Sequence, residues 1–306
     1  MRVAAIDIGT NTVLLLVAEK DDRGELRAVR EEATITRLGE GVDKTRKLAP
    51  AAIARTNACL LQYATIVREL AVPRVAVVGT SAMRDAGGGE EVRAKVRELF
   101  GVEARTISGE EEARLTFAGA LSGLDASGKV AVFDIGGGST EVVVGEGDSV
   151  SASHSFDVGS VRLTERHVRN DPPTGAQMDA MTEDARRAFA SEPRLFEAAR
   201  GAATAPIGIA GTVTTLAAVA LGLEPYDGAR VHGHVMSASE VRAVVDRLAA
   251  MRLEDRRAVR GLEPKRADVI VAGGLVVLAT LEALGADEMR VSDRGVRWGL
   301  AETLAR

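Results

Sequence analysis

The chain has 306 residues, of which 46% are hydrophobic, and this length exceeds a usual single core and favours two domains. Its 39 basic and 44 acidic side chains give a formal net charge of −5, which argues against a nucleic-acid coat, and an aromatic content of 3% argues against base-stacking platforms. The first thirty residues do not resemble a signal peptide and no apolar run is long enough to cross a bilayer, so we expect a cytoplasmic protein without a membrane partner.

The chain opens with a segment that recurs later. AAIDIGTNTVLLLVAE (residues 4–19) and AVFDIGGGSTEVVVGE (residues 131–146) share an apolar run, Asp-Ile-Gly, a hydroxyl-bearing turn and a second apolar run, with Asp7 and Asp134 at equivalent positions. Apolar runs around a short turn of glycine and small polar residues predict a β-hairpin in each copy, and hence two similar domains. Because glycine lacks a Cβ, such turns expose backbone N–H groups, an arrangement that suits an anion.

Helices and strands alternate after the first hairpin. Residues 50–70 carry a helical apolar stripe, residues 74–84 read as a buried strand that runs into a loop, and residues 90–101 read as a helix that ends at its glycine. Cys59, the single cysteine, is expected to be a small core residue of the first helix. One cysteine permits neither an internal disulfide nor a cysteine metal cluster, which fits a reducing compartment.

The segment TISGEEEARLTFAGALSG (residues 106–123) holds the strongest candidate for chemistry. Ser108 and Glu111 have the spacing of a capping box, so the Glu111 side chain is expected to fold back onto the Ser108 N–H. Glu112 points about 100° away from Glu111, on a stripe with Leu115, Thr116 and Gly119 that is able to face a cleft. Its side chain has no structural partner in this pattern, and an anionic carboxylate there suits a general base. The residues alone leave open that these glutamates only complement the helix dipole.

The second half of the chain continues the alternation of strands and helices. Thr174 with Gln177, and Ser237 with Glu240, predict two further capping boxes. Residues 266–285 are apolar enough for a buried helix, and residues 288–305 read as strand, turn and final helix. This order predicts an α/β fold.

Some polar residues admit two interpretations. In GIAGTVTTLA (residues 208–217), glycine and threonine suit either a phosphate pocket or close strand-to-helix packing. His232 and His234 have the spacing of a metal pair, although a polar loop is favoured because no third ligand is near in sequence. A basic path for an anionic substrate, as opposed to scattered solvated side chains, would be built from Arg37, Arg46, Lys47, Arg162 and Arg266.

Seven motifs in one chain resemble the exopolyphosphatase/guanosine pentaphosphate phosphatase family in their order and spacing: IDIGTNT, GTSAMR, ISGEEEARL, FDIGGGSTE, VGSVRLTE, GIAGTVTTLA and VSDRGVRWGL. The likeness spans almost the entire chain. It implies an α/β fold of two ribonuclease H-like domains, as in actin, acetate kinase, sugar kinases and heat-shock chaperones, with an interdomain cleft. The expected domains are residues 1–124 and 125–306, with the final helix free to pack back on the first domain.

The resemblance also implies a site. Glu112 matches the family's general base, and Arg84 matches its phosphate-binding arginine. Asp134 and Glu141 match candidates for the shell of a catalytic Mg²⁺, with Mn²⁺ as the alternative ion. The residues expected to bind phosphate are Asp7, Gly9, Thr10, Asn11, Thr12, Gly136, Gly137, Gly138, Ser139, Gly211 and Thr212.

The implied activity is hydrolysis of the terminal phosphoanhydride of inorganic polyphosphate, with release of orthophosphate. The alternatives are a guanosine pentaphosphate 5′-phosphohydrolase, an ATP-using kinase or chaperone-like ATPase, and a weakly catalytic polyphosphate or nucleotide sensor. Glu112 and Arg84 argue against the kinase, and the lack of a guanine-reading aromatic favours polyphosphate. The family also implies a homodimer. Longer relatives carry a further helical region after the position of RWGLAETLAR, so processive digestion of very long chains is less expected here than hydrolysis itself.

Overall fold

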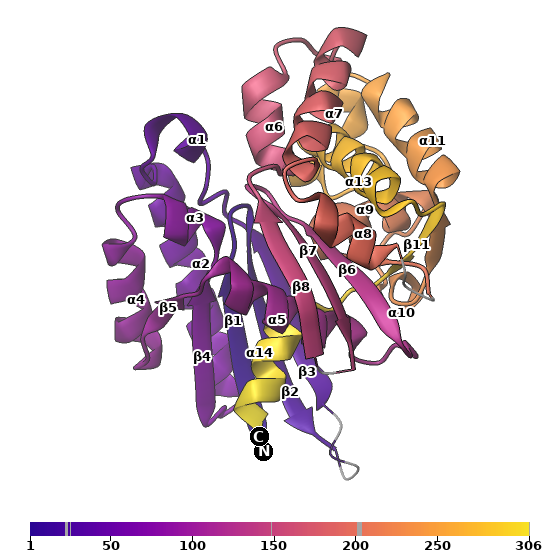
Figure 1. Cartoon of the computed structure of the whole chain (residues 1–306). Helices are drawn as coiled ribbons and strands as arrows, with labels where there is room; N and C mark the ends of the chain where they lie inside the picture. Colours follow the sequence, from indigo (N-terminus) through magenta and orange to yellow (C-terminus); the bar gives the residue numbers. More distant parts are fainter. Residues whose placement is uncertain (22–23, 25, 148, 201–203, 306) are drawn as a thin grey trace. The chain divides into compact units, whose positions relative to one another are not determined.

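The computed structural model describes residues 1–21, 24, 26–147, 149–200 and 204–305, and the chain forms two compact units (Figure 1). Unit 1 consists of Met1–Gly119 together with Val296–Arg306, and unit 2 consists of Ala120–Gly295. The contacts therefore divide the chain close to the boundary expected at residue 124. They also group the C-terminal helix with unit 1, where Figure 1 shows it in yellow beside the indigo strands.

Unit 1 is built on a five-stranded mixed sheet with the order β3-β2-β1-β4-β5. β1 pairs antiparallel with β2 and β2 with β3, whereas β1–β4 and β4–β5 are parallel. The strands are β1 (Arg2–Ile8), β2 (Thr12–Lys20), β3 (Leu26–Ile35), β4 (Arg74–Gly79) and β5 (Ala104–Thr106). The helices are α1 (Val42–Thr45), α2 (Pro50–Glu69), α3 (Ser81–Asp85), α4 (Glu90–Phe100), α5 (Gly109–Leu121) and α14 (Val296–Ala305).

Unit 2 is built on a six-stranded mixed sheet with the order β10-β11-β9-β6-β7-β8. Its strands are β6 (Lys129–Ile135), β7 (Thr140–Glu146), β8 (Ser149–Phe156), β9 (Ile207–Ile209), β10 (Val235–Ser237) and β11 (Glu288–Val291). Its helices are α6 (Ser160–His167), α7 (Gly175–Phe189), α8 (Pro193–Ala199), α9 (Ala210–Ala220), α10 (Gly228–Val231), α11 (Ala238–Ala249), α12 (Leu253–Arg256) and α13 (Ile270–Leu284), with a 3₁₀ turn, η1 (Pro264–Arg266).

The two units share one topology, as the repeated hairpin predicts. β8-β7-β6-β9-β11 of unit 2 reproduces β3-β2-β1-β4-β5 of unit 1, with two antiparallel pairs followed by two parallel pairs. The repeat extends to the register, because Asp7 faces Leu14 in the first hairpin and Asp134 faces Glu141 at the equivalent place in the second. The prediction of an α/β fold with two related domains is therefore confirmed.

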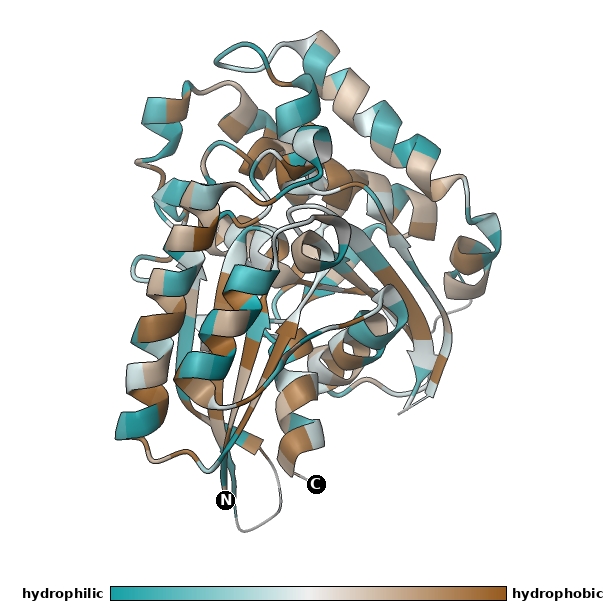
Figure 2. Ribbon diagram, turned by 90° about the vertical axis from the view of Figure 1, so that its left-hand side faces the viewer, coloured by the Kyte–Doolittle hydropathy of each residue, from teal (hydrophilic) through white to brown (hydrophobic). Residues whose placement is uncertain are grey.

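The central strand β1 of unit 1 is buried on both faces. In β1, Ala4 and Ile6 join the cluster formed with α2 and α4, whereas Val3 and Ala5 join the cluster formed with α14. This alternation follows from the two-residue period of a strand, and it explains why the run is apolar throughout. Figure 2 shows the strands as mostly hydrophobic, while the helices carry both hydrophobic and hydrophilic residues.

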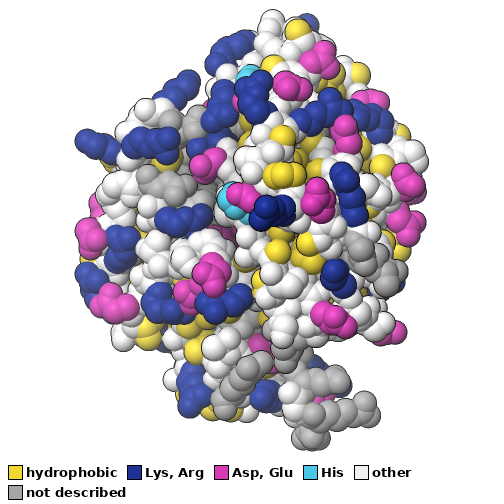
Figure 3. All heavy atoms as spheres, viewed as in Figure 1, with side chains coloured by type: hydrophobic (Ala, Val, Ile, Leu, Met, Phe, Trp, Pro, Cys, Tyr) yellow, Lys and Arg dark blue, Asp and Glu magenta, His cyan; other side chains and the backbone are white. Residues whose placement is uncertain are grey.

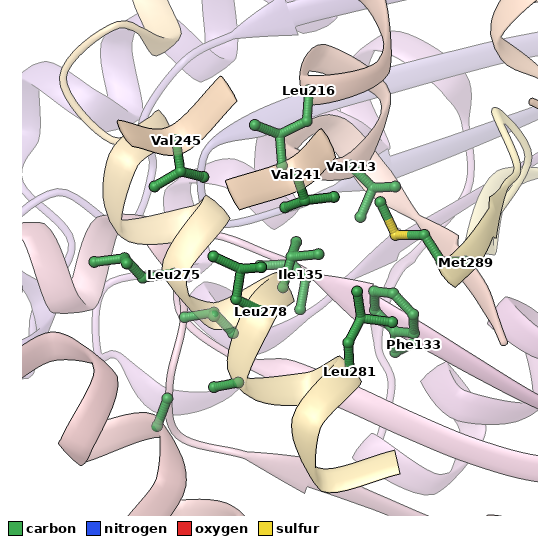
Figure 4. Packing of buried hydrophobic residues seen from close by; sticks show 14 of the residues in the cluster. Phe133, Ile135, Val213, Leu216, Val241, Val245, Leu275, Leu278, Leu281 and Met289 are labelled. Carbon is green, nitrogen blue, oxygen red and sulfur yellow. The ribbon is translucent and has the colours of Figure 1, made fainter. Parts of the chain in front are cut away.

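The core of unit 2 lies between its sheet and α9, α11 and α13. Figure 4 shows Phe133 of β6 close to Leu281 of α13, with side chains of α9 and α11 around them. α13 is buried over most of its length, as its apolar sequence predicts. Gly274 allows α11 to approach, because a Cβ at that position would overlap Val245.

Most predicted elements are confirmed, with two local differences. Residues 81–85, expected as a loop, form the short helix α3, and the buried helix expected from residue 266 begins at Ile270 after the η1 turn. The two capping boxes at Thr174 and Ser237 are formed, and Gly101 ends α4 in the left-handed conformation with φ of 69°. Glycine accepts this φ without the steric cost of a Cβ.

Cys59 lies in the core, as expected. It is 2% exposed on α2, and burial raises the pKa of its thiol, while hydrogen bonds with Thr34 and Tyr63 oppose that shift. The thiol therefore behaves as a small core group and not as a reactive one.

The outer surface carries both signs of charge. On the face shown in Figure 3, Lys and Arg side chains are interspersed with Asp and Glu. Among the helices that the structure describes, none combines the length and the apolar character needed to span a membrane.

Candidate active site

The carboxyl ends of three parallel strands lie side by side at one edge of the unit 1 sheet. Ile8 of β1 is in register with Gly79 of β4, which is in register with Thr106 of β5. The chain leaves each strand at this edge, and the Thr80 N–H donates to Ile8 O at 3.2 Å while the Ile107 N–H donates to Gly79 O at 3.1 Å. Parallel strands bring residues that are distant in sequence together at their carboxyl ends, and in unit 1 most of the predicted site residues follow these ends.

The loop between β1 and β2 is a tight turn. The Gly9 N–H donates to Thr12 O at 3.1 Å, and a Cβ at Gly9 would lie 2.9 Å from that oxygen, so the turn needs glycine there. Thr10 Oγ1 and Ser81 Oγ, at the start of α3, share a hydrogen bond of 2.6 Å. Asp7 and Asn11, the other polar residues expected here, are each 8% exposed. The loop is thus fixed to the segment that carries Arg84.

Arg84 and Glu112 are in direct contact. Arg84 Nη1 lies 3.0 Å from Glu112 Oε2 and also donates to Ile107 O at 3.2 Å. The Glu112 side chain is 8% exposed and that of Arg84 is 26% exposed. The sequence predicts a glutamate without a structural partner, and the structure corrects this: because α3 and α5 begin at adjacent strand ends, the carboxylate is paired with the guanidinium.

Glu111 forms only part of the capping box that the sequence predicts with Ser108. The Glu111 N–H donates to Ser108 Oγ at 3.1 Å, so half of the capping box is formed. The Glu111 carboxylate, however, pairs with Arg105 Nη2 of β5 at 2.9 Å instead of reaching back to the Ser108 N–H. A charged donor on the preceding strand outcompetes a neutral N–H for the carboxylate.

The stripe that holds Glu112 is largely packed within unit 1. Thr116 is fully buried, and Gly299 of α14 approaches α5 so closely that a Cβ there would overlap Leu115 O. The expectation that the whole stripe faces a cleft is therefore wrong at Leu115, where a second helix covers it. The N-terminal turn of α5, with Glu112, lies beyond this contact.

In unit 2 two carboxylates lie on neighbouring strands. Asp134 of β6 and Glu141 of β7 are register partners, so their side chains leave the same face of the sheet. Ser155 of β8 donates its hydroxyl to Glu141 Oε1 at 2.6 Å, and Glu141 is 2% exposed. The described residues contain no group of three or more His, Cys, Asp or Glu side chains that could hold a metal. Mg²⁺ commonly uses one or two carboxylates together with waters and substrate oxygens, so this pair fits such an ion.

The loop that follows β6 repeats the turn of unit 1. The Gly136 N–H donates to Ser139 O at 3.0 Å, and a Cβ at Gly136 would lie 3.1 Å from that oxygen. Gly136 and Ser139 are the counterparts of Gly9 and Thr12 in the repeat, so the two loops close with the same hydrogen bond. Ser139 is 4% exposed.

The start of α9 is closely packed. A Cβ at Gly211 would overlap the guanidinium of Arg266, and a Cβ at Gly273 of α13 would lie 2.6 Å from Thr212 Cγ2. Thr212 itself is 5% exposed. These close contacts are with the η1 turn and with α13, and a role for Gly211 and Thr212 in phosphate binding stays a prediction.

Two hydroxyl residues extend the predicted site. Ser81 holds the first loop and Ser155 holds Glu141, and neither was among the predicted residues. Ser81 lies inside the GTSAMR motif, between Thr80 and Arg84, so the motif contained a usable signal. Ser155 lies outside the seven motifs, and only the pairing of β7 with β8 reveals it.

His232 takes a structural role. Its Nδ1 accepts the backbone N–H of Asp293 at 3.3 Å, which ties the segment after α10 to the end of β11. Whether His232 and His234 form a polar loop or a metal pair stays a prediction.

Known proteins are similar to this chain over nearly its whole length. The model of the Ppx/GppA phosphatase family matches residues 16–305. The chain is 40% identical to exopolyphosphatase 2 of Mycobacterium tuberculosis, across 99% of this chain and 98% of that protein. It is 30% identical to the guanosine-5′-triphosphate,3′-diphosphate pyrophosphatase of Vibrio atlanticus, covering 97% of this chain and 58% of that protein.

A solved structure of the family has a similar fold. The Ppx/GppA family member of Aquifex aeolicus superposes with a TM-score of 0.81 at 36% identity, covering 99% of this chain and 97% of that one. The chain matches the family over nearly its full length. It also has two sheets with a common strand order, an arginine–glutamate pair at the strand ends of unit 1, and a glycine turn at the equivalent place in each unit. The chain belongs to the Ppx/GppA phosphatase family.

Proposed function

We propose that this protein is an exopolyphosphatase that hydrolyses the terminal phosphoanhydride of inorganic polyphosphate in a magnesium-dependent reaction. The observation that carries the proposal is the contact between Arg84 and Glu112 at 3.0 Å, at the carboxyl ends of β4 and β5. A guanidinium that binds phosphate and a carboxylate that receives a proton are thereby held side by side.

In the proposed reaction a water oxygen attacks the terminal phosphorus. Glu112 accepts a proton from that water as the new P–O bond forms, and the bond to the bridging oxygen breaks with its electron pair on the shortened chain. The products are orthophosphate and a polyphosphate that is one unit shorter. Arg84 donates hydrogen bonds to the transferred phosphoryl group, on which charge is spread over the non-bridging oxygens.

Asp134 and Glu141 are the residues that would hold Mg²⁺. When bound, the ion neutralises charge on the phosphate oxygens. Ser155 keeps one oxygen of Glu141 oriented by its hydrogen bond of 2.6 Å. The N–H groups of the loops that contain Gly9 and Gly136 are expected to donate to the remaining phosphate oxygens.

The similarity to two kinds of phosphatase leaves two candidate substrates, polyphosphate and guanosine pentaphosphate. The match to an exopolyphosphatase covers 98% of that relative at 40% identity, whereas the match to a guanosine-5′-triphosphate,3′-diphosphate pyrophosphatase covers 58% at 30% identity. Together with an aromatic content of 3%, which offers few rings for stacking a guanine, this supports polyphosphate. Guanosine pentaphosphate 5′-phosphohydrolysis is the second candidate function.

Phosphate release from the two substrates tests the choice. At matched enzyme and magnesium concentrations we expect kcat/KM for polyphosphate to exceed that for guanosine pentaphosphate. The reverse order would establish the second candidate. Tight binding without phosphate release from either substrate would instead indicate a sensor, and use of ATP only with an acceptor would indicate a kinase.

Removal of divalent cations tests the metal requirement. We expect EDTA to abolish phosphate release and added Mg²⁺ to restore it, with Mn²⁺ as a comparison. Asp134→Asn should raise the Mg²⁺ concentration for half-maximal activity at least about 10-fold, since even the partners of metal ligands contribute that much to metal affinity. Asp125→Asn, an exposed aspartate of the same unit, serves as the control. Full activity in EDTA would contradict the magnesium proposal.

The homodimer implied by the family likeness and the cytoplasmic location expected from the sequence remain predictions. Size-exclusion chromatography with light scattering would test the first and subcellular fractionation the second.

A further inference from the structure

The three glycines of the second loop are held from their carbonyl side by the start of α6. Gly136 O accepts the Ser160 N–H at 3.0 Å and the Ser160 hydroxyl at 3.2 Å. Gly137 O accepts the N–H groups of Val161 at 2.9 Å and Arg162 at 3.1 Å. Two of the three carbonyls are thus fixed by the first turn of a helix that directly follows the β8 strand.

The third carbonyl is held by a side chain. Arg162 Nε donates to Gly138 O at 2.7 Å, and Nη2 of the same guanidinium lies 3.5 Å from the exposed carboxylate of Asp157. The Arg162 side chain is only 8% exposed. The sequence offered Arg162 either as part of a basic path for substrate or as a scattered solvated side chain, and the second interpretation is wrong because the guanidinium is buried against the loop.

Close approach between α6 and the loop depends on one residue. A Cβ at Gly159 would lie 2.5 Å from Gly137 O and 2.6 Å from Gly137 C, a separation that real Cβ atoms do not show. Glycine at 159 therefore lets the helix reach the loop. Gly159, Ser160 and Arg162 all belong to the motif VGSVRLTE. This motif therefore holds the glycine loop of the motif FDIGGGSTE in place.

Because the carbonyl groups of the glycine loop are fixed, the directions of its N–H groups are fixed as well. A trans peptide is planar, so its C=O and its N–H point in opposite directions. With the carbonyls of Gly136, Gly137 and Gly138 on α6, the N–H groups of Gly137, Gly138 and Ser139 face away from it. Within the part of the chain that the structure describes, these three N–H groups donate to no protein acceptor. Successive N–H groups of this kind form an anion-binding surface.

The first loop is held without such a side chain. Thr10 O accepts the Gly39 N–H at 2.9 Å and Asn11 O accepts the Thr36 N–H at 3.0 Å, so backbone groups suffice there. In the first copy the residues that follow β3, among them Thr36 and Gly39, make these contacts through their backbone N–H groups. The second loop contains three successive glycines, which allow more backbone conformations than other residues do. In this loop the Arg162 side chain supplies a hydrogen bond in addition to the backbone contacts.

We propose that Arg162 is a positioning residue for phosphate: its Nε–H fixes the peptide between Gly138 and Ser139 so that the Ser139 N–H is presented to a phosphate oxygen. The proposal rests on the function proposed above, because the ligand is the phosphate chain. Arg162 is 8% exposed on its side chain and bonded to Gly138, so it acts through the loop and not by touching substrate.

Three variants and one control test the proposal. Arg162→Met removes the Nε donor and the charge, Arg162→Lys retains the charge without the Nε donor, and Gly159→Ala displaces the loop without altering Arg162. The control is Arg169→Met, since Arg169 donates to the carbonyls at the other end of α6, those of Glu165, Arg166 and Val168. Each protein is assayed for its Kd for tripolyphosphate with Mg²⁺ by calorimetry, for KM and kcat by phosphate release, and for Tm.

We expect Arg162→Met to raise Kd and KM for tripolyphosphate about 10- to 100-fold, the loss expected when a hydrogen bond to a charged group goes unmade, while kcat falls less. Arg162→Lys should recover part of the affinity, and Gly159→Ala should weaken binding in the same direction. Arg169→Met should stay within about twofold of the wild type, as surface substitutions usually do.

The outcomes separate the inference from the proposed function. Affinities of both Arg162 variants within about twofold of the Arg169→Met control would overturn the inference while leaving the hydrolase intact. A wild-type protein that neither binds nor hydrolyses tripolyphosphate would overturn the proposed function and the inference with it. If Arg162→Met does not fold, the same comparison of Kd is made with Arg162→Lys and Gly159→Ala, below the Tm of each.

Discussion

Replacing Glu112 with glutamine should lower kcat for phosphate release about 10²- to 10⁴-fold, the usual contribution of a general base. Glutamine keeps the size of the side chain and an oxygen that can accept a hydrogen bond from Arg84, so the local packing of this 8% exposed group is preserved. What is lost is the capacity to take a proton from water. Steady-state phosphate release and calorimetric binding of tripolyphosphate measure the two effects separately.

Binding should survive this substitution or become tighter. In the proposed complex, Arg84 would be shared between Glu112 and the phosphate, and a neutral glutamine would compete less for the guanidinium. Glu111→Gln is the matched control, because Glu111 stands one residue away and pairs with Arg105 instead. Equal losses in the two variants would mean that the charge of the first turn of α5 matters and that Glu112 has no specific role. A normal kcat for Glu112→Gln would show that Glu112 is not the general base.

The sequence predicts those parts of the fold that repeat or alternate. The repeated Asp-Ile-Gly segment predicts two hairpins and two similar domains, and the same correspondence recurs in the turns closed by Gly9 and Gly136. The helices α2, α4 and α13 follow from apolar periodicity and from terminal glycines. These signals are local: each can be read from a window of about twenty residues.

The contacts inside the site are not local. Arg84 and Glu112 stand 28 residues apart and meet because β4 and β5 are parallel neighbours, a pairing that no short window contains. The same holds for Arg162, which looks like a surface arginine in sequence and becomes buried when α6 packs against the glycine loop. Sequence motifs predict which residues belong to the site, whereas the sheet order decides which of them touch.

The second large effect is expected for Arg84. Arg84→Ala should lower kcat/KM for polyphosphate by about 10³-fold or more, the scale on which an arginine stabilises phosphoryl-transfer transition states. Both KM and kcat should change, because the guanidinium would bind ground-state phosphate and the charge that develops in the reaction. Initial rates over a range of tripolyphosphate concentrations give both constants.

Arg84→Lys should recover only part of the activity. In the wild type, one guanidinium nitrogen donates to both Glu112 and Ile107 O, and the planar geometry of the group suits hydrogen bonds to phosphate oxygens. A lysine ammonium has no second nitrogen with which to do both. Arg105→Ala, which removes the neighbouring arginine of β5, is the control and should leave kcat/KM within about threefold, as expected for an exposed ion pair. An Arg84→Ala protein with unchanged KM and kcat would remove this residue from the site.

The double variant Arg84→Ala/Glu112→Gln decides whether the two residues act as one device. Groups in contact that serve the same step lose activity non-additively, so the double variant should be far less impaired than the product of the two single effects. Independent residues would multiply their losses. Because the single Arg84→Ala change also leaves a buried carboxylate without its guanidinium, part of its cost should disappear when Glu112 is neutralised in the same chain. A fully multiplicative cycle would place the two residues in separate roles despite their 3.0 Å contact.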